Sequence, residues 1–305
     1  MWRRKKSKGT PLMASAAGLA FAGLVGAAEL GRRLFRNATL FSPSPDPALT
    51  WNPADYGLDP GVVEEITFRS DGEVLYGWYC RAEKPIASAL FCHGKTGNFT
   101  ASAEAVCHLV EHGISVFVFD YRGFGKSTGR PSIRGVVRDA VAASRRHDLL
   151  RPQNVPSILY GYSLGGAIAA QTAQLHEFDG LILQSTFTNL PDIARTYFPR
   201  LPMHLVSGRE LDTLRVVSSL KIPLYVIHGT ADETVPCSMG CAIYDSCPAE
   251  KAIEIIRDGE HKNLFDVAAD RIVGGVIGFV TKLGPRSLMP RLAPSEETTS
   301  QSLGR

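Results

Sequence analysis

Short apolar runs and longer mixed segments alternate along most of the chain, and their order predicts its secondary structure. The short runs are rich in Val, Ile, Leu and Phe, which is typical of buried strands. We expect strands at residues 87–92, 114–119, 157–160, 180–183, 224–228 and 252–256. We expect helices at residues 102–112, 132–150, from 164 onward, around 238–244 and at 263–280.

A hairpin precedes this alternation. Residues 62–68 and 73–79 flank the dipeptide Asp71-Gly72, which is typical of a tight turn between antiparallel strands. Strands that alternate with helices after an opening hairpin predict a mostly parallel sheet with helices on both faces. The predicted fold class is therefore α/β, with an antiparallel hairpin at the start of the sheet.

The segments on either side of this pattern are expected to lie outside the folded domain. Five prolines fall within residues 37–60, which predicts an extended linker. Residues 284–305 are polar and rich in Pro and Ser, and we interpret them as a disordered tail. The folded domain is thus expected at residues 61–283.

Residues 1–36 have a different composition from the rest of the chain. Five basic side chains fall within residues 1–8, residues 11–28 carry no charge, and three arginines follow closely. An uncharged stretch of 18 residues meets the lower limit for a membrane-spanning helix. We favour an uncleaved single-pass membrane anchor, and the alternatives are a cleaved secretory signal and a mitochondrial presequence.

The net charge of +3 arises from the N-terminal basic run. Without those five residues, 28 basic residues face 30 acidic ones. Because a nearly neutral body lacks the basic surface that nucleic-acid binding requires, we expect no nucleic-acid partner. With 305 residues, of which 44% are hydrophobic, the chain has material for one large domain.

The sequence around Ser163 has the form of a nucleophile elbow. Gly161-Tyr162-Ser163-Leu164-Gly165 joins an expected strand to an expected helix, and such a turn presents the serine hydroxyl outside the sheet. Glycine is expected two residues away on either side, because the turn brings those positions against neighbouring backbone. Ser127 lies in a second match to the pattern, but that match has no strand before it and no helix after it. Context therefore selects Ser163.

A serine nucleophile needs a general base, and the base needs an acidic residue to orient it. In an elbow enzyme the acid and then the histidine follow the serine along the chain. His261 lies in a polar loop between the last strand and the last helix, at the sheet edge where catalytic side chains converge. Asp232, directly after the penultimate strand, is the favoured acid, and Glu233 and Asp258 are its rivals.

A tetrahedral intermediate also needs two N–H donors for its oxyanion. One is expected from the backbone of Leu164, immediately after the nucleophile. The other is expected from the loop after the strand at 87–92, with the backbone of Lys95 as the favoured donor. The alternative is that this glycine-rich loop is a turn without a catalytic role.

In combination these motifs resemble the α/β-hydrolase superfamily, and specifically its small single-domain members with an N-terminal membrane anchor. The resemblance implies a catalytic triad of Ser163, Asp232 and His261, and it implies no metal and no cofactor. In this family the loop at residues 120–127 is mainly architectural. The motifs span about 170 residues in the family's order and comprise His93-Gly94, Gly97-Asn98, Asp120 to Ser127, Gly161 to Gly165, His228-Gly229, Asp232, Val235-Pro236 and Gly259-Glu260-His261.

Members of this superfamily insert a lid between the sixth and seventh strands, which corresponds here to about residues 186–221. A lid this short would leave an open, apolar groove for an acyl group. The alternative is that its apolar residues merely pack on the sheet. The superfamily includes esterases, thioesterases that remove acyl groups from proteins, and peptidases, so the resemblance does not define the substrate.

We therefore expect a membrane-anchored serine hydrolase that cleaves a carboxylic ester or thioester through an acyl-enzyme. The expected substrate is a small-molecule or lipid acyl ester, or an acylated protein. One alternative is a serine peptidase of the same fold, although such enzymes usually carry an additional domain that grips the peptide. Another is a non-catalytic binding protein of the same fold, although such proteins typically lose the serine or the histidine, and both are present here.

Overall fold

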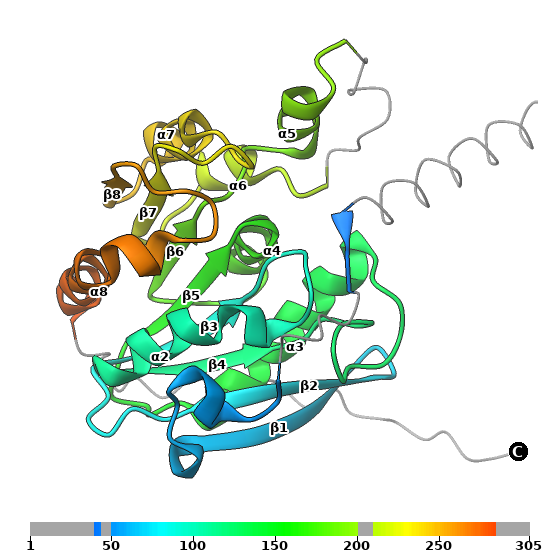
Figure 1. Ribbon diagram of the computed structural model, residues 1–305, viewed down its shortest axis with the longest axis vertical. Helices are drawn as coiled ribbons and strands as arrows, with labels where there is room; N and C mark the ends of the chain where they lie inside the picture. The colour runs from blue at the N-terminus through cyan, green and yellow to red at the C-terminus, as the bar shows by residue number, and fades with distance from the viewer. Residues whose placement is uncertain (1–39, 44–49, 201–209, 285–305) are drawn as a thin grey trace, which may run out of the picture.

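The computed structural model describes residues 40–43, 50–200 and 210–284. An eight-stranded sheet runs through this part of the chain in the order β1-β2-β4-β3-β5-β6-β7-β8 (Figure 1). The strands are β1 (Val63–Ser70), β2 (Glu73–Cys80), β3 (Ala87–Cys92), β4 (Ile114–Phe119), β5 (Ser157–Tyr162), β6 (Gly180–Gln184), β7 (Leu224–Gly229) and β8 (Lys251–Ile256).

The predicted fold class is confirmed. Strands β1 and β2 form an antiparallel hairpin, and β2 also pairs antiparallel with β4. Every other neighbouring pair, from β4 through β3 and on to β8, is parallel. Asp71 and Gly72 form the hairpin turn with φ of 47° and 87°, which is the left-handed geometry that two-residue hairpin loops favour.

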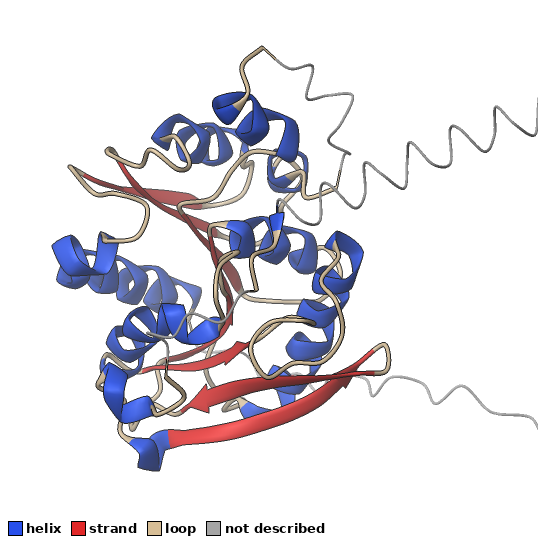
Figure 2. Cartoon of the chain, turned by 45° about the vertical axis from the view of Figure 1, so that its right-hand side comes forward, coloured by secondary structure: helices blue, strands red, loops and turns tan. Residues whose placement is uncertain are grey.

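Helices cover both faces of this sheet (Figure 2). Side chains of α2 and α8 pack on one face. Side chains of α3, α4, α6 and α7 pack on the other face. The helices are α2 (Ala103–Glu111), α3 (Ile133–Leu150), α4 (Leu164–Ala173), α5 (Leu190–Tyr197), α6 (Thr213–Val217), α7 (Cys237–Ser246) and α8 (Leu264–Leu283).

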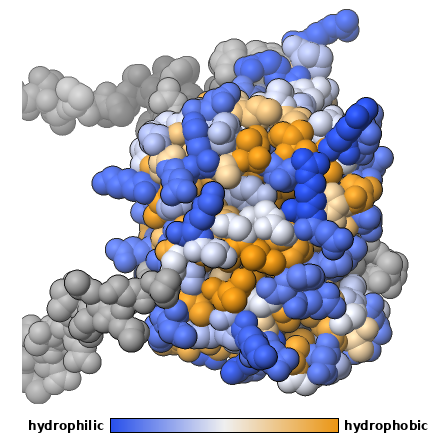
Figure 3. Space-filling view, turned by 90° about the vertical axis from the view of Figure 1, so that its left-hand side faces the viewer, coloured by the Kyte–Doolittle hydropathy of each residue, from blue (hydrophilic) through white to orange (hydrophobic). Residues whose placement is uncertain are grey.

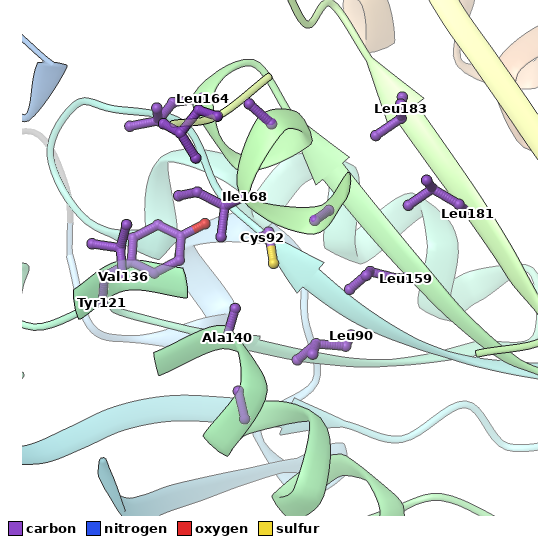
Figure 4. Close-up of a cluster of buried hydrophobic side chains, with 14 of the residues drawn as sticks. Leu90, Cys92, Tyr121, Val136, Ala140, Leu159, Leu164, Ile168, Leu181 and Leu183 are labelled. Carbon is purple, nitrogen blue, oxygen red and sulfur yellow. The ribbon is translucent and has the colours of Figure 1, made fainter. Parts of the chain in front are cut away.

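Alternation along the strands creates two hydrophobic cores. Successive strand residues point to opposite faces, so Ala89 and Phe91 of β3 join the core under α2 and α8. Leu90 and Cys92 join the core under α3 and α4. Figure 4 shows the second core, where leucines from β3, β5 and β6 meet side chains of both helices. The two cores fix the sheet, and thereby the loops at its carboxyl edge.

Residues 37–60, predicted as an extended linker, contribute packed side chains where they are described. Phe41 and Leu58 are buried. The ring of Trp51 lies edge-on to the rings of Tyr76 and Phe99, with centroids 5.4 and 5.5 Å away. Prolines are compatible with an extended chain, but burial of these aromatic and aliphatic side chains holds the segment against the domain.

The predicted anchor at residues 11–28 lies outside the described residues, as does the predicted tail beyond Gly284. Of the helices that the structure describes, none is long and apolar enough to cross a membrane. Helix α8 has 20 residues but is amphipathic, because one side is buried in the core while Asp266 and Lys282 are exposed. On the side of the molecule that carries α8, hydrophilic side chains lie between hydrophobic patches (Figure 3).

Candidate active site

Ser163 lies at the sharp turn between β5 and α4, with φ of 55° and ψ of −120°. This conformation is costly for a residue with a Cβ atom. Two hydrogen bonds hold it: the Ser163 amide donates to the Gln184 carbonyl over 2.9 Å, and the Thr186 hydroxyl donates to the Ser163 carbonyl over 2.7 Å. The backbone of the turn is thus fixed to the last residue of β6 and to the segment that follows this strand.

The glycines on either side of the turn fill positions without space for a side chain. A Cβ atom at Gly161 would lie 2.5 Å from the carbonyl oxygen of Gly165. A Cβ atom at Gly165 would overlap the carbonyl of Cys92 at the end of β3. The close backbone approach expected from the motif is therefore present.

The structure brings Ser163, His261 and Asp232 into one hydrogen-bonded chain. Nε2 of His261 lies 2.9 Å from Oγ of Ser163, and Nδ1 of His261 lies 2.8 Å from Oδ2 of Asp232. Both rival acids point elsewhere: Glu233 is exposed, and the side chain of Asp258 is 87% exposed beside Arg257. Strands β5, β7 and β8 are parallel, so the loops that follow them meet at one edge of the sheet.

The carboxylate of Asp232 is buried but well supplied with donors. Its Oδ1 accepts hydrogen bonds from the amides of Thr234 and Val235 over 2.9 and 2.7 Å. Burial disfavours the charged form, but contacts with His228 and His261 and the bond from Val235 outweigh it and hold the pKa of Asp232 well below its usual range. Asp232 therefore stays ionised at neutral pH.

His228 supports this carboxylate and is not a rival base. Its side chain is fully buried, and Nε2 lies 2.9 Å from the Val235 carbonyl. The same nitrogen is 3.4 Å from Oδ2 of Asp232, a longer contact. His228 therefore packs against the buried acid.

Two contacts at the site join residues that are far apart in the sequence. The hydroxyl of Tyr162 donates to the backbone carbonyl of His261 over 3.0 Å. The amide of Ser42 donates to the Lys95 carbonyl over 2.9 Å, and the Gly97 amide donates to the Ser42 carbonyl over 3.0 Å. The position of Tyr162 inside the elbow motif is a signal that sequence reasoning could have used. Nothing in the sequence around Ser42 indicates that it holds the loop after β3.

Both expected oxyanion donors lie on the cavity beside Ser163. Leu164 is the first residue of α4, and its amide has no acceptor within the helix. Its side chain is 3% exposed and belongs to the core, so its backbone is fixed. Lys95 lies in the loop between β3 and α2. Their role as donors stays a prediction.

Ser127, in the rejected match to the elbow pattern, is held by hydrogen bonds to the backbone. Its hydroxyl donates to the Asp120 carbonyl over 2.8 Å and accepts from the Tyr76 amide over 3.0 Å. The side chain is buried. The loop at residues 120–127 therefore supports the sheet, in agreement with the architectural role expected for it.

A cavity of about 820 Å³ opens beside the hydrogen-bonded chain. Its apolar lining includes Phe187 and Leu190 at the start of the predicted lid and Ile193, Tyr197 and Phe198 from α5 and its end. Leu190 is also a core residue, so it packs on the domain as well as lining the cavity. Residues 201–209 of the predicted lid lie outside the described residues.

A metal site needs a cluster of side chains that can bind the ion. Across residues 40–43, 50–200 and 210–284, no group of three or more His, Cys, Asp or Glu side chains could hold a metal ion.

Comparison with known proteins agrees with this architecture. The family described as serine aminopeptidase, S33 matches residues 83–208. The uncharacterized protein YfhR of Escherichia coli is 35% identical over 227 residues, which cover 69% of this chain and 77% of YfhR. The uncharacterized protein Rv2307c of Mycobacterium tuberculosis is 30% identical over 203 residues, which cover 66% of this chain and 71% of that protein.

Solved structures show the same fold at low sequence identity. The Pyrococcus furiosus esterase Pf2001 superposes with a TM-score of 0.64 at 20% identity, over 80% of this chain and 98% of the esterase. An esterase from Exiguobacterium antarcticum superposes with a TM-score of 0.56 at 16% identity, over 72% of this chain and 100% of that one. The sheet order, the elbow and these likenesses define an α/β hydrolase. Within that superfamily, the chain belongs to the family of YfhR and Rv2307c.

Proposed function

We propose that this protein is a serine hydrolase that cleaves a carboxylic ester or thioester through an acyl-enzyme. The observation that carries the proposal is the hydrogen-bonded chain from Ser163 through His261 to Asp232 beside an apolar cavity. A hydroxyl, an imidazole and a buried carboxylate in this order form the arrangement that activates serine.

In the proposed reaction, Ser163 Oγ attacks the acyl carbonyl carbon while Nε2 of His261 takes the hydroxyl proton. The amides of Leu164 and Lys95 donate to the oxyanion. When the bond to the leaving group breaks, His261 returns the proton to the departing oxygen or sulfur. Water then attacks the acyl-enzyme with the same base, which releases the acid and regenerates Ser163.

Asp232 would keep the imidazole of His261 in the productive orientation throughout. Its Oδ2 accepts from Nδ1, so the free nitrogen, Nε2, faces the hydroxyl. The low pKa of the carboxyl supports the stabilisation of an imidazolium without proton transfer to Asp232.

The lining of the cavity supports an acyl chain as the group that is bound. The side chains contributed by residues 187–198 are mostly apolar and aromatic, and burial of an acyl chain against them removes apolar surface from water. We therefore propose a lipid-like acyl ester, or the acyl group of an acylated protein, as the substrate.

Peptide hydrolysis is the second candidate. It is supported by the match of residues 83–208 to the serine aminopeptidase family and by Glu104 on the cavity lining, since a carboxylate could bind a free α-amino group. Parallel assays with an acyl ester and an aminoacyl arylamide distinguish the two candidates.

A fluorophosphonate probe provides the direct test of the nucleophile. Wild-type protein should be labelled and Ser163→Ala should not, whereas Ser127→Ala should retain labelling if thermal melting shows that it is folded. Labelling that persists in Ser163→Ala would show that another residue is the nucleophile.

We also propose that residues 11–28 anchor the protein in a membrane, with a cleaved signal or a mitochondrial presequence as the alternatives. The uncharged stretch between basic flanks supports this proposal. The full chain should then remain with membranes after alkaline carbonate extraction. A mature protein whose first residue lies beyond Ala28 would contradict the anchor and leave the proposed chemistry unaffected.

A further inference from the structure

The cavity beside Ser163 carries exposed charges as well as an apolar lining. Lys95, Glu104 and Lys262 all line it, and all three side chains are exposed. Neither lysine forms an ion pair or a side-chain hydrogen bond with any residue that the structure describes. Two cations without an acidic partner therefore lie on the site where the substrate would bind.

Both lysines are adjacent in sequence to residues that lie beside Ser163. Lys95 follows Gly94, where a Cβ atom would lie 3.7 Å from the Cβ atom of Ser163. Lys262 follows His261, whose Nε2 lies 2.9 Å from Ser163 Oγ. Consecutive Cα atoms are about 3.8 Å apart, and a lysine side chain is long and flexible. Both ammonium groups can therefore reach the surroundings of the scissile bond.

The lysines come from other loops than the largest apolar group of the cavity lining. The largest apolar group of the lining comes from residues 187–198 after β6, and Leu40, Ala105 and Phe265 add apolar side chains from other segments. Lys95 lies in the loop after β3, and Lys262 lies in the loop after β8. An acyl chain against residues 187–198 would therefore leave the other part of the ester, its leaving group, near the two lysines.

We propose that Lys95 and Lys262 bind an anionic group, a phosphate or a carboxylate, on the leaving group of the substrate. This inference rests on the proposed ester hydrolysis at Ser163. An anion at the edge of a partly water-excluded cavity interacts more strongly with ammonium groups than it would in bulk water. The substrate class is thus an acyl ester whose alcohol or thiol carries a negative charge close to the scissile bond.

Glu104 provides the opposite charge on the same cavity. It lies on α2 near Asp266 of α8, and His108 of α2 stacks on Phe265 with ring centroids 5.7 Å apart. Burial, followed by the charge of Asp266, raises the pKa of Glu104. Because its carboxylate repels an anion, removal of this charge should favour the proposed substrate, whereas removal of either lysine should disfavour it.

The experiment compares matched pairs of esters with the same butanoyl group. One pair is 4-(butanoyloxy)benzoate and the neutral 4-(butanoyloxy)benzamide. The other pair is butanoyl glycerol phosphate and butanoyl glycerol. For each pair, the ratio of kcat/KM for the anionic ester to kcat/KM for the neutral ester is measured in the full-length protein. Differences in leaving-group reactivity cancel when this ratio is compared between variants.

We expect Lys95→Gln and Lys262→Gln each to lower the ratio about two- to fivefold, as for the loss of a partly exposed ion pair. Glu104→Gln should raise it, and Lys282→Gln, a matched change far along α8, should leave it unchanged. The wild-type ratio should fall in about 1 M salt, where the Debye length is only about 3 Å. If the lysine variants lower the ratio only for the benzoate pair, the bound anion is a carboxylate. If they lower it only for the glycerol phosphate pair, the bound anion is a phosphate.

The results separate this inference from the function on which it rests. If the protein hydrolyses the neutral esters through Ser163 but the lysine variants leave the ratio unchanged, the anion site is wrong and the hydrolase stands. If none of the esters is cleaved and no probe labels Ser163, the proposed function fails and the anion site fails with it. Equal loss of the ratio in Lys282→Gln would also overturn the inference, because it would show an effect of overall charge.

Discussion

At the scale of single residues, the site depends on which of several acidic side chains is directed at His261. Asp232→Asn should lower kcat on the order of 10³- to 10⁴-fold with little change in KM, because an amide favours the wrong imidazole tautomer. Steady-state kinetics with a short acyl ester measures both constants. Glu233→Gln and Asp258→Asn are the controls and should remain close to wild type. An inactive control beside an active Asp232→Asn would mean that the acid is misassigned.

Asp120 is a second buried carboxyl, and its pKa is shifted in the opposite direction from that of Asp232. Burial raises its pKa to about 8, although the bond from the Phe99 amide opposes the shift. In the unfolded chain this carboxyl has its ordinary pKa of 3.8, so between that value and about 8 the folded state binds a proton that the unfolded state has lost. The stability that this proton provides is complete below about pH 4 and is lost as the pH rises toward 8.

We therefore expect Asp120→Asn to flatten the dependence of Tm on pH between about 5 and 8. An amide cannot ionise, but its oxygen can still accept from the Phe99 amide. Melting curves of the wild type and the variant across this range measure the effect. Parallel curves would show that Asp120 is already ionised in the folded protein.

At the scale of elements, α5 connects the lid to the proposed specificity for acyl groups. Ile193 lines the cavity, so Ile193→Trp should make the cavity shallower. It should lower kcat/KM for esters of long acyl chains more than for acetyl esters. Thr196 lies on the same helix, is exposed and does not line the cavity, which makes Thr196→Trp a matched control. Chain-length profiles of the three proteins test this expectation. An unchanged profile in Ile193→Trp would place the acyl chain elsewhere.

The sequence predicted strands and helices well where burial creates a strong pattern. Strand β3 was predicted at its observed bounds, because a mainly apolar run of residues ends at His93-Gly94. Helices α5 and α6 were not predicted individually, since they are short and begin within a segment of mixed composition. The packing of Phe41 and Leu58 was missed because it depends on surfaces made by distant parts of the chain.

In the proposed site too, contacts between distant parts of the chain could not be predicted from the sequence. Ser163, Asp232 and His261 were found through their order and their positions after strands, which are local features. Tyr162 and Ser42 act on residues far away in the sequence, and such contacts arise only when the sheet is assembled. Sequence motifs thus identified the residues that we propose to react, whereas the residues that hold them in place were found only in the folded structure.

At the scale of the whole molecule, the described residues before β1 pack on the domain and pair with the loop after β3. A protein that begins at residue 40 should therefore retain ester hydrolysis and a melting temperature close to that of the full chain. A protein that begins at residue 59 should lose much of both, because it lacks Phe41, Ser42, Trp51 and Leu58. Activity and Tm of the two truncated proteins test this. Full activity in the shorter one would show that the segment is dispensable.

The pairing of Ser42 with the loop after β3 also determines a path for mechanical force. Ser42 bridges Thr96 in a parallel arrangement, and its two backbone hydrogen bonds reach Lys95 and Gly97. A pull on the chain before Leu40 would therefore load this loop before it loads the sheet. Such tension would reach the loop beside Ser163 before the rest of the domain, so the proposed reaction would depend on how this segment is held.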